Sequence, residues 1–227
     1  HKETIVVPDN EEPIVSIFTD PEMQGTKVQL FIKRPALPKQ MGNTIVAEAN
    51  NVIEAYTTTM ENARLQEIAM QPDAPFLGAG MGTGDVIGII PTLNATVFVA
   101  MTQDGKLARG FEALYTELEK VRRYGFTQGD FERAQDNLMR QAERTYANRN
   151  DRRNGEFVQS YLNNYSKNSP IPDAETEWQL DSMLIKMLNV DAVNAFAVQT
   201  ITPANQVIIV NAPEKEGLTT PTAEELL

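Results

Sequence analysis

The feature that most constrains the fold is the stretch 43–90, which predicts one long helix, a break at Pro72 and Pro75, and then a glycine-rich strand. In the first half, apolar or small side chains recur every three or four residues, a spacing that places them on one helical face. They are Ile45, Ala49, Val52, Tyr56, Met60 and Ala63. We expect this face to lie on a sheet, and either Asn43 or Thr44 to cap the helix.

The glycine run forms the second half of this stretch. Alternate residues of an extended chain point to one side, and here that side is bare because it consists of Gly78, Gly80, Gly82 and Gly84. Two interpretations are open. Either the preceding helix packs closely on the bare side, or the strand is a docking site that an extended peptide joins by β-augmentation. A dinucleotide-binding loop is excluded, because its third glycine would fall at Thr83 or Asp85 and because a strand, not a helix, is expected to continue through 86–90.

The remaining segments predict an α+β fold. Short β-rich runs at 14–19 and 26–34 precede the long helix, and a strand at 93–101 should pair with the glycine run as an antiparallel hairpin. Helical spacing then continues through five segments, up to the apolar strand at 207–210. Because strands and helices come in runs rather than in alternation, we expect a two-layer sandwich of a mixed or mostly antiparallel sheet with helices packed on one face.

Local signals mark the ends of several helices. Gly125 should close the helix whose buried stripe is Leu107, Phe111, Leu114, Leu118 and Val121. Thr127 and Asp130 have the spacing of a capping box, and Asp173 and Asp191 are expected to cap two later helices.

One domain is the simplest division, because no flexible linker interrupts the middle of the chain. We expect this domain to span residues 14–213. The polar, proline-marked residues 1–13 resemble a linker from an upstream domain, and residues 214–227 a polar tail or linker.

The scarcity of histidine and cysteine restricts the chemistry. The 227 residues include one histidine, His1, and no cysteine, so histidine-based triads and typical zinc sites are closed to this chain. A net charge of −11 argues against nucleic acid and anionic membranes as partners, and no apolar run approaches the ~20 residues of a membrane span. Asp85, Glu112 and Glu117 are available acids, but their spacing singles out no catalytic pair. We therefore predict no catalytic and no metal-binding residues.

Four segments carry a likeness to a known family, in the same order over nearly the whole chain. They are NARLQEI (62–68), QPDAPFLGAG (71–80), FEALYTELEKVRRYGFTQGDFERAQDNL (111–138) and TPANQVIIVNAPEK (202–215). Together they resemble the pitrilysin/insulysin-like zinc metallopeptidases, particularly the bacterial, periplasmic pqqL-like branch. The resemblance implies a domain of the LuxS/MPP-like fold that this family uses.

The resemblance also implies a non-catalytic role. In this family only the first domain holds zinc, through an inverted H-x-x-E-H motif, and the present sequence has no such motif. The chain resembles the second domain, which implies no cofactor of its own and zinc in an upstream domain of a parent peptidase. The implied partners are peptide substrates and homologous domains of the same parent chain, and the implied location is the periplasm or cell envelope. A catalytically inactive structural or interaction subunit of the same family is the alternative.

Finally, the resemblance implies an exosite. In insulysin-like members the strand after this helix pairs through its main chain with the substrate's N-terminal end, and by position that strand consists of Leu77, Gly78, Ala79, Gly80 and Met81. The histidines that hold the substrate terminus in insulysin are missing here, which places recognition of a free amino terminus in doubt. Arg64 and Glu67 are available for charged contacts with a peptide, although Arg64 also fits a pairing with a neighbouring carboxylate.

Overall fold

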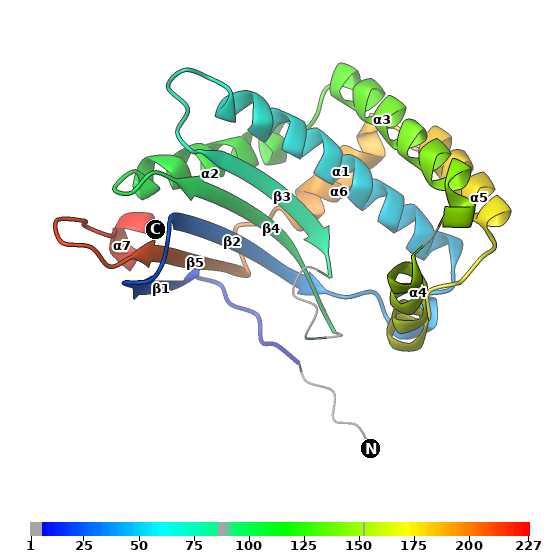
Figure 1. The fold of residues 1–227 in the computed structure, drawn as a ribbon, viewed down its shortest axis with the longest axis horizontal. Coiled ribbons are helices and arrows are strands. Elements are labelled where there is room, and N and C mark those ends of the chain that lie inside the picture. The colour runs from blue at the N-terminus through cyan, green and yellow to red at the C-terminus, as the bar shows by residue number, and fades with distance from the viewer. Residues whose placement is uncertain (1–5, 86–89, 91, 152) are drawn as a thin grey trace.

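The structure, a computed structural model, describes residues 6–85, 90, 92–151 and 153–227. Its strands are β1 (Ile14–Asp20), β2 (Thr26–Pro35), β3 (Gly78–Gly84), β4 (Leu93–Thr102) and β5 (Gln206–Pro213). They form one sheet in the order β1-β5-β2-β4-β3 (Figure 1). β1 runs parallel to β5, and the other neighbouring pairs are antiparallel, including the expected pairing of β3 with β4. The prediction of a mostly antiparallel sheet is confirmed.

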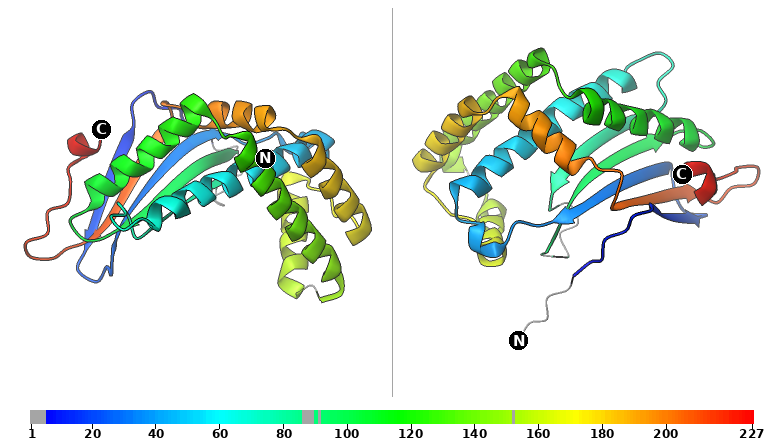
Figure 2. Two further views of the ribbon diagram at one scale, coloured as in Figure 1. Left: turned by 90° about the horizontal axis from the view of Figure 1, so that it is seen from above. Right: turned by 180° about the vertical axis from the view of Figure 1, so that it is seen from behind.

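Helices form a second layer on one face of the sheet (Figures 1 and 2). Those that contact the strands or each other are α1 (Ile45–Ala69), α2 (Leu107–Tyr124), α3 (Gln128–Ala147), α5 (Ala174–Met187) and α6 (Val190–Thr200). α1 packs beside β3, α2 packs on β4 and β2, and α6 contacts both helices. α3 and α5 pack against each other and against α1 as an outer pair. The predicted α+β sandwich is therefore confirmed.

The remaining helical segments lie at the periphery. They are η1 (Lys39–Met41), η2 (Arg149–Asp151), α4 (Asn154–Lys167) and the short α7 (Ala223–Leu226). α4 projects from the body of the protein beside η1 (Figure 1). Its apolar side chains are largely exposed, among them Phe157, Val158, Tyr161, Leu162 and Tyr165.

Helix ends follow the local sequence signals with one exception. Thr44 caps α1 and accepts a hydrogen bond from the Ala47 N–H, and Thr127 and Asp130 form the predicted capping box of α3. Gly125 ends α2 at φ +70°, a conformation that favours glycine. The prediction of Asp191 as a cap is wrong, because the side chain of Asn189 accepts from the Ala192 N–H instead.

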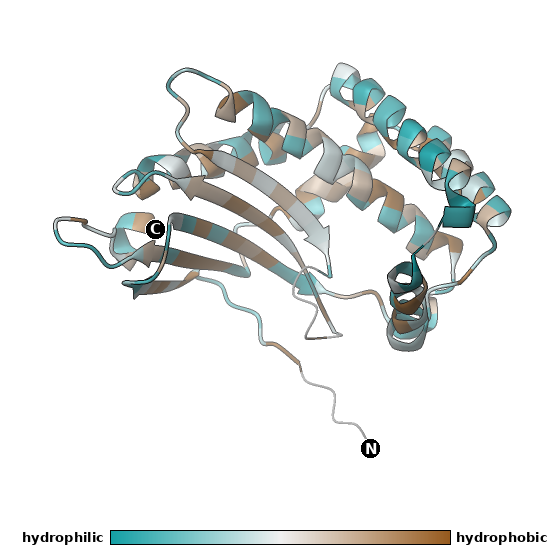
Figure 3. Cartoon of the chain, in the orientation of Figure 1, coloured by the Kyte–Doolittle hydropathy of each residue, from teal (hydrophilic) through white to brown (hydrophobic). Residues whose placement is uncertain are grey.

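The core lies between the sheet and the helices, and all five predicted positions of α2 are buried in it. The stripe predicted for α1 is only partly correct, because Ile45 and Ala63 are exposed whereas Tyr56 and Met60 are buried. α1 also buries polar positions, notably Glu61, because it touches β3 as well as α3, α5 and α6. In Figure 3 α3 is mostly hydrophilic, whereas the strands carry many hydrophobic residues.

Both ends of the chain contact the body of the domain. The Asn10 N–H donates to Asn205 Oδ1 at 2.9 Å, and Lys33 Nζ donates to the Pro8 carbonyl at 2.7 Å. At the other end Leu226 of α7 is buried in the core, and α7 contacts β1 and α2. Segments that the sequence suggests are linkers thus contribute packing and hydrogen bonds.

Candidate functional site

The glycine run forms β3, an outermost strand of the sheet (Figure 1). Among the described strands it pairs with β4 alone, from Gly78 opposite Met101 to Gly84 opposite Ala95. Leu77 lies just before the strand, where its N–H donates to the Met101 carbonyl at 2.7 Å and its side chain is 65% exposed. Of the expected continuation of the strand through 86–90, residues 86–89 lie outside the described residues. At Ile90 the prediction is wrong, because this residue lies outside any strand and its carbonyl accepts from the Leu93 N–H at 3.1 Å. The predicted docking residues therefore lie at the start of an edge strand.

The pairing register decides which way the glycines face. Directly opposed residues of an antiparallel pair share a face, so Gly78 faces the same way as Met101, which is 54% exposed. Met81 faces the other way, with the fully buried Phe98. A Cβ added at Gly78 would meet no atom within 4 Å. At this end of β3 the bare side therefore faces away from the helix layer, and internal packing gives no reason for glycine.

The far end of β3 is different. Gly84 has φ +102°, and a Cβ there would lie 2.7 Å from Glu54 Oε2. Glu54 is itself held by Arg34, whose guanidinium also donates to Thr83 Oγ1 at 2.9 Å. Backbone conformation and contact with α1 explain this glycine, so close helix packing accounts for only one end of the run.

We call the side of β3 that points away from β4 the β3 edge. Met81 uses both of its main-chain groups on this side: its N–H donates to Asn62 Oδ1 at 2.7 Å, and its carbonyl accepts from Asn62 Nδ2 at 3.0 Å. Because main-chain groups alternate along an antiparallel strand, the groups of Ala79 and Thr83 also point outward. In the described part of the chain, these two residues have no main-chain hydrogen bond on that side.

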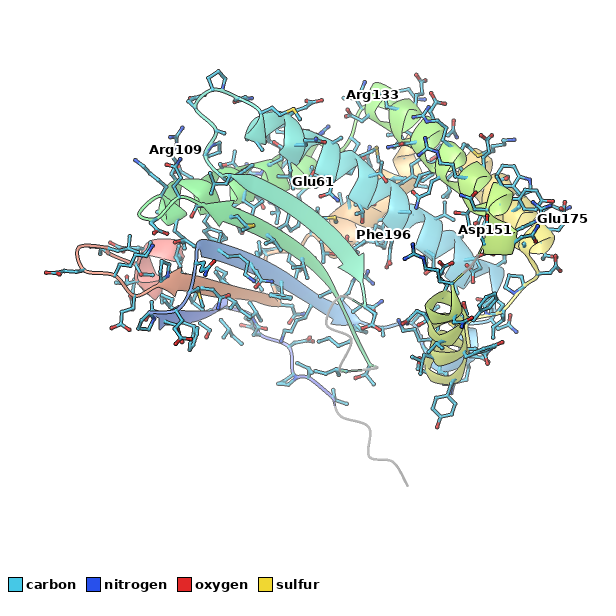
Figure 4. The ribbon with its side chains drawn as sticks, in the orientation of Figure 1. Glu61, Arg109, Arg133, Asp151, Glu175 and Phe196 are labelled. Carbon is cyan, nitrogen blue, oxygen red and sulfur yellow. The ribbon has the colours of Figure 1, made fainter. Side chains whose placement is uncertain are left out.

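A groove runs beside the β3 edge, between α1 and α3. It has a volume of about 330 Å³, and its lining is mostly polar: Asn51, Glu54, Ala55, Thr58, Thr59, Thr83, Leu138 and Gln141. A second hollow of about 390 Å³ continues between the same helices, shares Thr59, and is bordered by Arg133 (Figure 4). Two hollows with mostly polar linings are thus open between α1 and α3, and Thr83 of β3 lines the first of them.

A cluster of charged side chains ties α1 to α2 and α3. Arg64 contacts Glu117 at 3.4 Å and Asp130 at 2.8 Å, and its guanidinium lies over the ring of Phe126. Burial raises the pKa of Asp130, but hydrogen bonds from Arg64 and Thr127 outweigh it and hold that pKa below its ordinary value. Arg64 is therefore occupied by neighbouring carboxylates, the alternative that the sequence left open.

Glu61 is the unusual member of this cluster (Figure 4). It is fully buried, and neither carboxylate oxygen has a hydrogen-bond partner among the described residues. Burial and then the nearby Glu117 carboxylate raise its pKa to about 8, whereas Arg64 lowers it. Glu61 is therefore a neutral acid over most of the physiological range.

No family model and no curated protein matches this sequence. Solved structures do match. The first half of the periplasmic protease PqqL from Escherichia coli has a TM-score of 0.81 and 14% identity, over 93% of this chain and 44% of that one. A predicted insulinase family protease from Yersinia pestis has a TM-score of 0.79 and 12% identity, over 99% of this chain and 46% of that one. A peptidase M16 inactive domain from Pseudomonas fluorescens has a TM-score of 0.64 and 12% identity, over 97% of this chain and 48% of that one. The chain has the M16 (insulinase/pitrilysin) peptidase fold. It spans a little less than half the length of each of these structures.

The M16 peptidases use zinc, which in proteins is held by His, Cys, Asp and Glu side chains. Within the described ranges, no three His, Cys, Asp or Glu side chains come together to hold a metal ion. The acids noted in the sequence are engaged separately: Asp85 pairs with Lys167, Glu117 pairs with Arg64 and Lys120, and Glu112 is exposed. These residues do not fit the zinc site of the M16 fold. None of the described helices has the length and apolar character needed to cross a bilayer.

Sequence reasoning found the glycine strand but missed two residues. Asn62 lies inside the motif NARLQEI, and nothing in its spacing shows that its carboxamide reaches the strand edge. Glu61 precedes it, and its burial follows only from the three-sided packing of α1. An acid four positions before the apolar Leu65, and so on the same helical face, was the available signal, but exposed acids have the same pattern on many helices.

Proposed function

We propose that this chain is a non-catalytic domain of an M16-type zinc metallopeptidase, and that it forms part of the wall of the peptide chamber. The observation that carries the proposal is the edge position of the glycine strand within an M16 fold. The likeness to an M16 inactive domain and the unsuitability of this chain's residues for zinc support a non-catalytic role. The zinc would belong to a homologous domain of the same parent chain, and this chain alone would have no peptidase activity.

The face of the sheet opposite the helices supports a role as a chamber wall. The register places a set of apolar side chains there, and they are partly or largely exposed: Ile14, Phe18, Phe31, Val99, Met101, Val207 and Ile209. The bare side of Gly78 extends this face to the edge of the sheet. The same register places Lys27, Gln29 and Lys33 on this face, so its apolar side chains are interspersed with polar ones. Such a face suits contact with extended, unfolded polypeptide or with a neighbouring domain.

The β3 edge supports pairing with the main chain of a peptide. Strand addition requires unpaired N–H and C=O groups along an accessible edge, and the outward groups of Ala79 and Thr83 satisfy this requirement. Main-chain pairing is indifferent to most side chains, which suits a protease domain that handles varied peptides. We therefore propose Leu77 to Met81 as the start of a peptide-docking strand, with Thr83 as its continuation.

The match to a periplasmic protease supports a periplasmic or cell-envelope location for the parent protein. The implied partners are then peptides in that compartment and the homologous domains of the parent. The net charge of −11 gives no support for nucleic acid as a partner.

The test is a titration of the ¹⁵N-labelled chain with an unstructured peptide, followed by amide chemical shifts. We expect shifts centred on Ala79 and Thr83. Ala79→Pro should abolish them, because proline removes the outward N–H while the inward ladder at Gly78 and Gly80 remains. Ala79→Gly keeps the N–H and is the matched control. Unchanged shifts along β3 at millimolar peptide would leave only a structural subunit.

A further inference from the structure

Asn62 occupies the middle of the β3 edge in the way that a partner strand would. Its carboxamide accepts from the Met81 N–H at 2.7 Å and donates to the Met81 carbonyl at 3.0 Å. An opposing residue of an added antiparallel strand makes the same two bonds, one to each main-chain group. The side chain thus imitates one residue of a guest strand.

The position of this contact divides the edge into two parts. The outward groups of Ala79 lie on one side of Met81 and those of Thr83 on the other, and neither has a main-chain partner there among the described residues. A peptide that paired with Ala79 and continued along β3 would meet the Asn62 carboxamide at the next outward position. A continuous guest strand therefore requires these two hydrogen bonds to break.

We propose that Asn62 is an intramolecular competitor for the peptide-docking edge, displaced when an extended polypeptide segment pairs along β3. This inference rests on the proposed docking function and adds a contact within the chain that regulates peptide docking. The occupant is defined by main-chain chemistry: an unfolded segment long enough to span Ala79 to Thr83. A segment that reaches only Ala79 leaves the contact intact, so the competition weakens the binding only of segments that continue past Ala79 along β3.

The surroundings of Asn62 are compatible with this displacement. Its Oδ1 lies 3.4 Å from the position that a Cβ would take at Gly80, an ordinary van der Waals contact, and glycine leaves this position open. One turn earlier on the same helical face, Thr58 and Thr59 line the polar α1–α3 groove. The groove offers polar surroundings to a carboxamide that has left the edge.

In the free protein the same contact protects the domain. Unpaired strand edges promote pairing between copies of a chain, and native proteins commonly block them with a side chain or a charge. With its central position filled by Asn62, β3 offers no continuous run of free main-chain groups.

The experiment compares the wild-type chain with Asn62→Ala, and uses Asn50→Ala as the control, an asparagine on the same helix that lines neither hollow between α1 and α3. Without peptide, we expect hydrogen exchange of the Met81 amide to accelerate in Asn62→Ala and to stay unchanged in the control. With an unstructured peptide long enough to span the strand, Asn62→Ala should bind roughly tenfold more tightly or better, because two neutral hydrogen bonds no longer have to break. Asn62→Asp keeps the acceptor for the Met81 N–H but loses the donor, and should behave as an intermediate if Asn62→Ala folds poorly.

Three outcomes overturn the inference, and they are distinguishable. If the wild-type chain binds along β3 and Asn62→Ala binds equally or more weakly, Asn62 is a structural tie or a direct contact and not a competitor. If neither chain shows shifts at Ala79 and Thr83, the docking function fails and the inference fails with it. Unchanged exchange of the Met81 amide in a folded Asn62→Ala chain would also contradict the proposed closure of the edge.

Discussion

Substitution of Glu61 by glutamine should convert a pH-sensitive core position into a pH-insensitive one. Glu61 is fully buried, and its carboxylate oxygens have no hydrogen-bond partner among the described residues. The groups that face it are Glu117 on α2, which opposes its ionisation, and Arg64 on its own helix, which favours it. Burial is the largest influence and raises the pKa of Glu61 to about 8.

The sign of the effect follows from proton linkage. Glu61 titrates near its ordinary 4.5 in the unfolded chain and near 8 in the folded protein, so the folded protein binds this proton more tightly. The contribution of this tighter proton binding to the free energy of unfolding is complete below pH 4.5 and is lost as the pH rises from 4.5 to about 8. The gap between these pKa values corresponds to at most about 5 kcal/mol. Because a charged Glu61 can turn toward Arg64 and recover part of this loss, we expect a difference of about 2–4 kcal/mol.

Urea unfolding, followed by circular dichroism at several pH values from 4.5 to 9, measures this difference. Glu61→Gln has no titrating group at this position, so its stability should exceed that of the wild type at pH 9 and approach it at pH 4.5. Glu67→Gln, an exposed position on the same helix, is the control and should leave the pH dependence unchanged. Parallel stability curves for the wild type and Glu61→Gln would refute the assignment of a neutral buried acid.

Two further predictions test helix packing and capping. Gly110→Ala should destabilise the domain by about 1–3 kcal/mol in urea unfolding, because the new Cβ would lie 2.3 Å from Thr102 Cγ2. Gly155→Ala is the control and should cost nothing, because its Cβ meets no atom within 4 Å, so equal stabilities for the two variants would contradict the packing. Thr127→Ala should lower the free energy of unfolding by about 1 kcal/mol, because the α3 capping box is lost. Thr127→Ser keeps the capping hydroxyl and should retain most of this stability, so an equal loss in both variants would contradict the cap.

The sequence predicted elements well where local chemistry dominates. The capping box at Thr127, the glycine at the end of α2 and the buried stripe of α2 all depend on residues within a few positions of each other. It was less successful for α1, where Ile45 is exposed and Glu61 is buried. Helical periodicity identifies one apolar face, but α1 is covered on several sides, and only long-range packing decides which polar residues become enclosed.

The strand order could not be read from the sequence either. β1 and β2 are neighbours in the chain, yet β5 lies between them in the sheet, and this order leaves β3 at an edge. The same holds for the candidate site. The sequence indicated a strand with one bare side, but only the pairing register and the Asn62 contact show which main-chain groups are free on its outer edge.

By itself, the sequence determined that this domain lacks the imidazole and thiolate groups of common catalytic sites and that a small-residue strand follows its longest helix. The tertiary structure alone decided that this strand ends the sheet, that its bare side faces away from the helices at Gly78, and that a helix side chain closes its middle. The physical reason is one of range. Residue chemistry and periodicity are properties of neighbouring positions, whereas the exposure of a strand edge depends on which distant segments pair with it.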